Sequence, residues 1–276
     1  ASQGYTPGEI ADTLELPKAL RNSFSNRGYY GTLKHNARAV YQRYFGWYDG
    51  NPANLDPLPI VESSARYVAA MGGSPGVMAI AQAAFDDGDY RWVAELLNHL
   101  IFAEPDHADA KMLLAQSYDQ LGYQAESGPW RDVYLTGALE LRQGAPTQGL
   151  GISNAADLLR KTPVSEFMQL IAVMLDGVAA DGESYVFNFI FTDLAETHVL
   201  NLENAVLHHR SGEPAANANA TLRITHDLFI KMLVGQAGIK ETLFSDDISI
   251  EGSRIDLLQF FALLDPPDEV FNIVTP

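Results

Sequence analysis

Side chains that donate hydrogen bonds are concentrated in one short stretch near the start of the chain. The stretch contains His35, Arg38, Tyr41, Arg43 and Tyr48. Donors of this kind bind the oxygens of an anion, so His35, Tyr41, Arg43 and Tyr48 are our candidate contributors to catalysis. Aromatic residues lie between and beside them, namely Tyr30, Tyr44, Phe45 and Trp47. The stretch therefore places hydrogen-bond donors and apolar surface within one short segment.

The same stretch also permits a purely structural interpretation. Thr32 is a typical N-cap and Gly46 a typical helix stop, which predicts a helix over residues 33–45. An aromatic helix of this kind often packs into the core of a helical bundle. The sequence leaves both interpretations open.

The histidines do not form a metal-binding pattern. They are scattered along the chain, and no two of them have the His-x-His or His-x-x-x-His spacing. Glu95 and His99 share a helix face, but one such pair is more often a surface contact. A two-metal hydrolytic site needs several converging histidines and carboxylates. We predict that this chain binds no zinc and no other cofactor, and we also expect no Gly-x-Ser-x-Gly nucleophile motif.

Length and charge limit the classes of function. A chain of 276 residues predicts two domains. The 18 Lys and Arg residues face 35 Asp and Glu residues, and the net charge of -17 repels phosphate backbones, so we expect no nucleic-acid partner. The longest apolar stretches are much shorter than the roughly 20 residues of a membrane span, and we expect none. There is no cysteine, which excludes disulfides and thiolate chemistry.

The first part of the chain has a helical pattern. Thr6-Pro7-Gly8-Glu9 is typical of a helix start, and residues 58–143 are helical throughout with short loops. A shift of 34 residues pairs Ala81 with Ala115 and Gly88 with Gly122. This spacing predicts degenerate tetratricopeptide-like hairpins, with both glycines at turns and Pro105 closing the first unit. A plain helical bundle remains an equal alternative.

The pattern changes after residues 144–149, which are the best linker candidate. We expect helices near residues 153–160 and 163–175, then antiparallel strands near 184–191, 197–202, 206–212 and 220–225. A helix between 225 and 234, a short strand at 248–250 and a last helix at 255–264 complete an α+β domain. The predicted domains are 1–146 and 147–276.

Three stretches of this chain resemble one protein family. They are residues 27–52, which include Arg27-Gly28-Tyr29-Tyr30-Gly31, His35-Asn36 and Gly46-Trp47-Tyr48-Asp49-Gly50-Asn51-Pro52; residues 124–138, which begin Gln124-Ala125-Glu126-Ser127-Gly128-Pro129-Trp130-Arg131; and Phe271-Asn272-Ile273-Val274-Thr275-Pro276. They resemble the alkylsulfatases that have a metallo-β-lactamase-type catalytic domain. The similarity in layout covers essentially the whole chain.

The resemblance implies a parent enzyme with three parts: a zinc domain, a helical dimerisation domain and a C-terminal domain like the sterol carrier proteins. Such enzymes hydrolyse alkyl sulfate esters such as dodecyl sulfate with two zinc ions, at a His-x-His-x-Asp-His motif that is not found here. The resemblance implies a homodimer, an upstream metallo-β-lactamase-type domain, an alkyl-chain or surfactant ligand, and a periplasmic or secreted location. Tyr30, Tyr44, Phe45 and Trp47 would then contact substrate at the entrance. In the second domain, the candidates for lining an alkyl-chain tunnel are Phe189, Phe191, Phe229 and Phe260.

Three functions remain to be distinguished. The first is the non-zinc portion of an alkylsulfatase, inactive alone, which provides dimerisation, part of the active-site entrance and alkyl-chain binding. The second is a free-standing lipid or surfactant carrier, which the start at Ala1 disfavours, since such a protein would normally begin with methionine. The third, an independent hydrolase built on His35, is the weakest.

Overall fold

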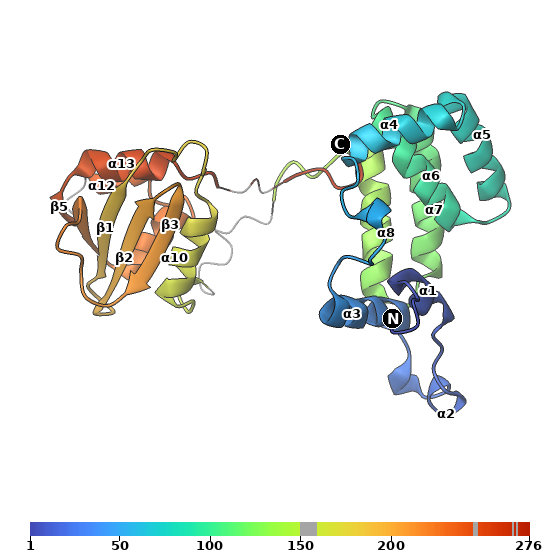
Figure 1. Cartoon of the computed structure of the whole chain (residues 1–276), viewed down its shortest axis with the longest axis horizontal. Coiled ribbons are helices and arrows are strands. Elements are labelled where there is room, and N and C mark those ends of the chain that lie inside the picture. The colour runs from blue at the N-terminus through green and yellow to red at the C-terminus, as the bar shows by residue number, and fades with distance from the viewer. Residues whose placement is uncertain (150–158, 245–247, 267, 269) are drawn as a thin grey trace. The chain divides into compact units, whose positions relative to one another are not determined.

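The computed structural model describes residues 1–149, 159–244, 248–266, 268 and 270–276, and the chain forms two compact units. One unit comprises Ala1–Pro146 and Phe271–Pro276, and the other comprises Thr147–Val270 (Figure 1). The expected boundary after residue 146 is where the chain leaves the first unit. The last six residues, which the prediction assigns to the second domain, pack on the helical unit, so the compact second unit ends at Val270.

The first unit begins with an N-terminal arm, residues 1–59, which contains the helices α1 (Pro7–Thr13), α2 (Lys18–Arg21) and α3 (Leu33–Phe45). Thr6 and Glu9 form a complete capping box at α1, as their types predict. Thr32 caps α3 by accepting a hydrogen bond from the His35 amide, and Gly46 ends it with a φ of 80°. The arm is thinly packed, since Ala11 is the one buried residue of these three helices.

Five helices follow the arm and form the body of the helical unit: α4 (Ile60–Ala70), α5 (Gly73–Asp86), α6 (Tyr90–Ala103), α7 (Ala108–Gln124) and α8 (Gly128–Gln143) (Figure 1). Their apolar faces meet in one buried core. It includes Val77, Ala81, Val93, Leu97, Leu100, Leu114, Ala115 and Ala138. The core therefore runs through successive hairpins, as the expected pairing of Ala81 with Ala115 requires.

The two glycines that the repeat pairs have different roles. Gly88 lies in the turn between α5 and α6 with a φ of 80°, as predicted. Gly122 lies inside α7, so its predicted place in a turn is wrong. A Cβ at Gly122 would lie 2.9 Å from Cδ2 of Leu135 on α8. Gly122 is therefore used for close approach of two helices rather than for a turn conformation.

The second unit is built on a five-stranded sheet with the order β3-β2-β1-β4-β5. Its strands are β1 (Tyr185–Phe191), β2 (Glu196–Glu203), β3 (Val206–Ser211), β4 (Ala220–Ile224) and β5 (Ser249–Gly252). The expected antiparallel pairing is found for β1–β2, β2–β3 and β4–β5, but β1 and β4 are parallel. The sheet is mixed because the chain crosses over from β3, at one edge, to place β4 beside β1.

Helices cover one face of this sheet. They are α10 (Val164–Val173), α11 (His226–Leu233), α12 (Ile239–Leu243) and α13 (Arg254–Ala262). Phe187, Phe189 and Phe191 alternate along β1 and so share one face. The Phe187 ring lies 5.3 Å from that of Phe260 on α13, and the Phe191 ring 5.2 Å from that of Phe229 on α11. The helix expected near residues 153–160 falls largely outside the described residues.

Among the described helices, none alone has the length and apolarity to cross a membrane. The pair α4 and α5 meets that test only when taken together, and it is bent by 83°.

Candidate functional site

The N-terminal arm is joined to the start of α8 by hydrogen bonds between two of the stretches that the sequence singles out. The Gly128 amide donates to the Tyr29 carbonyl oxygen at 2.8 Å, and the buried Ser127 hydroxyl donates to the Tyr30 carbonyl oxygen. Ser127 also caps α8 by accepting a hydrogen bond from the Trp130 amide. The junction therefore positions the turn that carries Tyr30.

Charged groups reinforce this junction. Arg27 of the arm forms an ion pair with Glu126, and Trp130 Nε1 donates to His35 Nδ1 at 3.4 Å. Glu126, which belongs to the stretch 124–138, is therefore paired with a residue of the arm. Partly exposed pairs contribute little stability individually, so they orient the arm more than they hold it.

A second set of contacts ties the arm to the body of the helical unit. Asp12 on α1 binds Lys34 at 2.6 Å and Arg91 on α6 at 3.4 Å. The hydrogen bond from Lys34, followed by the charge of Arg91, lowers the pKa of the Asp12 carboxyl below its usual value. The Asp12 side chain thus stays ionised beside two cations.

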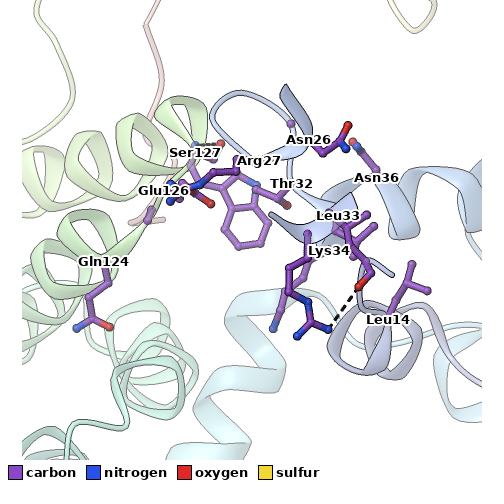
Figure 2. A pocket seen from close by; sticks show the side chains of 16 residues that line it. Leu14, Asn26, Arg27, Thr32, Leu33, Lys34, Asn36, Gln124, Glu126 and Ser127 are labelled. Carbon is purple, nitrogen blue, oxygen red and sulfur yellow. Dashed lines mark hydrogen bonds and ion pairs between the residues drawn. The ribbon is translucent and has the colours of Figure 1, made fainter. Parts of the chain in front are cut away.

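A cavity of about 750 Å³ lies between the arm and the start of α8. Figure 2 shows Arg27, Glu126 and Ser127 gathered on one side and Leu14, Leu33 and Lys34 on another. Its lining also includes Arg21, Asn26, Asn36 and Trp130. Three cations, one carboxylate and several amide groups therefore face a space of the size that small-molecule sites have.

The candidate residues of the arm divide into two groups. Tyr41 and Phe45 pack together at 5.1 Å between ring centroids and line a smaller cavity of about 340 Å³ against α1. Tyr48 contacts Trp47 at 5.5 Å. His35, Arg38 and Arg43 are exposed. Helix α3 therefore presents the donors His35, Arg38 and Arg43 at the surface.

The aromatic residues of the arm are not core residues of the helical unit. The exposed fraction is 82% for Tyr30, 79% for Tyr44, 69% for Trp47 and 56% for Phe45. No side chain of α3 is buried. The alternative that this helix packs into the bundle core is therefore not what the structure shows. Large aromatic side chains that are this exposed are available for contact with another surface.

The four phenylalanines proposed to line a tunnel are buried in the core of the second unit. Phe189, Phe191 and Phe260 have no exposed surface, and Phe229 is 1% exposed. Phe229 contacts the rings of Phe189 and Phe191 at 6.3 and 5.2 Å. They fill space against one another, as side chains do in any close-packed core, and their role in alkyl-chain binding stays a prediction.

The part of the chain that the structure describes contains no metal centre, since no three of its His, Asp or Glu side chains are grouped so that they could hold a metal ion. The zinc of the parent family therefore does not fit these residues. Contrary to expectation, Gly72-Gly73-Ser74-Pro75-Gly76 matches Gly-x-Ser-x-Gly by letter. It joins α4 to α5, whereas a nucleophile elbow joins a strand to a helix.

Several residues of the junction were missed when single residue types were considered. Asn26, Lys34 and Asn36 line the main cavity but have no motif of their own. Ser127 could have been found, because Ser-Gly-Pro is typical of an N-cap followed by proline in the first turn. The pairing of Arg27 with Glu126 could not, since the two residues are far apart in the chain.

Replacing Ser127 by alanine is expected to destabilise the helical unit by about 1–3 kcal/mol, because one substitution removes a cap and leaves the Tyr30 carbonyl without its donor. Asp89→Ala is the matched control, since Asp89 caps α6 through the Trp92 amide at the same 3.4 Å, and its side chain has no second hydrogen bond among the described residues. Chemical unfolding measures both. Equal losses for the two variants would contradict the junction.

Comparison with known proteins agrees with both units. The family model for alkyl sulfatase dimerisation matches residues 6–144, and the model for the alkyl sulfatase C-terminal region matches residues 153–276. A linear primary-alkylsulfatase of Pseudomonas sp is 43% identical over all 276 residues, which are 41% of that protein. An alkyl/aryl-sulfatase of Saccharomyces cerevisiae is 41% identical over the whole chain and 42% of its own length.

One solved structure gives the same result. The stereoselective inverting sec-alkylsulfatase Pisa1 from Pseudomonas sp. is 40% identical, has a TM-score of 0.90, and is matched over 100% of this chain and 43% of its own. This match confirms the predicted order of a helical domain followed by an α+β domain. A sterol carrier protein 2 from Yarrowia lipolytica is 18% identical over 43% of this chain, with a TM-score of 0.23. The chain spans about two fifths of the length of the curated relatives it matches.

Proposed function

Since this chain belongs to the alkylsulfatase family and comprises its dimerisation and C-terminal regions, we propose that it is the non-zinc portion of an enzyme that hydrolyses alkyl sulfate esters such as dodecyl sulfate. Its relatives include primary, secondary and alkyl/aryl sulfatases. The zinc ions and the attacking water belong, in this proposal, to a region that precedes the chain. The present residues bind and orient the ester.

The N-terminal arm forms one wall of the active-site entrance. The observation that carries this part of the proposal is that Tyr30, Tyr44 and Trp47 are exposed on the same arm as the exposed Arg43 and His35. A sulfate ester joins an anion to an apolar chain, so it needs donors and apolar surface close together. The arm offers both within one helix and the turn before it.

The two units contribute differently. We propose that the helical unit pairs two copies, a role that the description of the matched family model supports. Alkyl-chain binding in the second unit has weaker support, because its four candidate phenylalanines pack against other rings of the core. A periplasmic or secreted location is part of the same proposal and is supported by the family resemblance alone.

The test joins this chain to the preceding region of the Pseudomonas relative that is 43% identical. Trp47→Ala is expected to raise KM for dodecyl sulfate about 10-fold, since burying one aromatic side chain is worth about 1.5–3 kcal/mol. The effect is expected to be smaller for butyl sulfate, whose chain covers less apolar surface. Arg43→Ala is expected to lower kcat/KM about equally for both esters, because it acts on the sulfate group.

Tyr123→Ala is the control for these variants. Tyr123 lies on α7 and is 71% exposed, which is close to the 69% of Trp47, but it is outside the arm. Unchanged kcat/KM in both Trp47→Ala and Arg43→Ala would show that the arm is not part of the entrance.

A further inference from the structure

The last six residues of the chain are seated on the helical unit through a single carboxylate. The amides of Ile273 and Val274 both donate to Oε1 of Glu140 on α8, at 2.8 and 3.0 Å. Asn272 closes the segment on itself by donating to the Pro276 carbonyl oxygen at 2.9 Å. We call residues Phe271–Pro276 the C-terminal tail. It is a compact turn whose backbone amides bind Glu140 on α8.

Glu140 is suited to hold a bent backbone whose successive amides converge on one oxygen. It is 7% exposed, and the two amides are the hydrogen-bond partners that the structure gives its side chain. Hydrogen bonds to an ionised carboxylate are roughly twice as strong as neutral ones. A buried carboxylate without such partners is strongly unfavourable. In the folded helical unit, the Glu140 carboxylate is therefore stable only while hydrogen-bond donors such as these two amides contact it.

The tail lies in a groove beside Glu140, and Gly137 at the base of this groove leaves room for it. A Cβ at Gly137 would lie 3.4 Å from Cγ1 of Val274 and 3.3 Å from the Tyr118 ring. Val274 packs against the core of the helical unit, and a cavity of about 370 Å³ remains beside the tail. Tyr118 also lines this cavity, and burial, then Tyr134, then the Glu140 charge raise the pKa of its hydroxyl. The lining combines Val133 and the two tyrosines with the polar side chains of Asp132, Thr136 and Glu140.

We propose that this groove on α7 and α8 is a peptide-recognition site, and that the C-terminal tail occupies it in cis as a latch on the second unit. The ligand that it binds is a bent segment in which two successive backbone amides converge on one oxygen and which carries a small β-branched side chain. Phe271 and Ile273 are 68% and 69% exposed, so recognition is tolerant at their positions. Position 274 is restricted, because its amide and its side chain both enter the groove.

The latch determines how the second unit is connected. The chain leaves the helical unit at Pro146 and returns to it at Phe271, so residues 147–270 are held at both ends while the tail is docked. A segment in the same chain has a high effective concentration, and a weak contact is therefore well occupied. Release of the tail leaves the second unit attached through residue 147 alone.

The experiment uses a chain that lacks residues 271–276 and a fluorescent peptide of residues 268–276. The shortened chain is expected to bind the peptide with a Kd on the order of 10–100 µM, and the complete chain at least 10-fold more weakly because its own tail fills the groove. A peptide with Val274→Pro lacks one donor and is expected to bind at least 10-fold more weakly. Equal binding of both peptides to a folded shortened chain, or no binding, would overturn the proposal.

A second measurement does not depend on the shortened chain. In the complete protein, hydrogen exchange at the Ile273 and Val274 amides is expected to be at least 10-fold faster in Glu140→Ala than in wild type. Glu95→Ala on α6 is the control, because Glu95 lies outside the groove. Exchange rates at these two amides that do not change in Glu140→Ala would show that Glu140 does not hold the tail.

Discussion

Replacing Phe229 by alanine is expected to destabilise the second unit by about 3–5 kcal/mol, the cost of removing a large ring from a packed core. Phe229 is 1% exposed and meets three other rings, those of Phe167, Phe189 and Phe191, at 5.2 to 6.3 Å. Alanine would leave a void that these rings can fill only partly, because close-packed side chains relax little. Urea unfolding, followed by circular dichroism, measures the loss.

Phe244→Ala is the matched control in the same unit. Phe244 is 55% exposed and contacts the Arg254 guanidinium at 5.7 Å, so its removal is expected to cost about 1 kcal/mol or less. A loss of the same small size for Phe229→Ala would mean that its ring faces a hollow interior. That result would favour an alkyl-chain tunnel in the second unit over a filled core.

Gly252→Ala is expected to destabilise the same unit by about 2–4 kcal/mol, for two reasons that add. Gly252 has a φ of 95°, where a residue with a side chain is strained. Its new Cβ would lie 2.3 Å from the Asn219 carbonyl oxygen and 3.0 Å from Cα of Ala220. Both atoms belong to the backbone, and Ala220 is paired with Gly252 in the sheet, so neither can move aside cheaply.

Gly212→Ala separates the two causes. Gly212 follows β3 with a φ of 116°, but no atom lies within 4 Å of the position its Cβ would take. We expect it to lose about 1–2 kcal/mol from backbone strain alone. Thermal unfolding of the two variants should therefore give a larger loss for Gly252→Ala. Equal losses would show that the β4–β5 pair gives way to the added methyl group.

Local signals in the sequence predicted the element boundaries well. Thr6, Thr32 and Gly46 are each placed as their types indicate, because caps and stops depend on hydrogen bonds within a few residues. The same is true of the alternating strand that contains Phe187 and Phe191. These features could be read without knowledge of the rest of the chain.

Features that depend on distant contacts could not be predicted in this way. Gly122 matches the spacing of a turn glycine, but its role is to leave room for the Leu135 side chain on α8. The parallel pairing of β1 with β4 depends on a crossover that strand composition does not reveal. The return of the tail depends on Glu140, which is more than 130 residues away in the chain.

The candidate site stays a prediction. Tyr44 and Trp47 are exposed where a bundle-core helix would have buried them, which leaves them available for contact. What residue types could not indicate is that the positioning of the arm depends on Ser127 and Glu126, which contribute no chemistry of their own. Side chains that only hold a surface in place leave no pattern in a single sequence.

The return of residues 271–276 makes the helical unit a discontinuous domain with the α+β unit as an insertion. A helical unit prepared by simple truncation after Pro146 would keep Glu140 but lose the Ile273 and Val274 amides that satisfy it. To prepare the helical unit alone, residues 147–270 should therefore be replaced by a flexible Gly/Ser linker, so that residues 271–276 are kept.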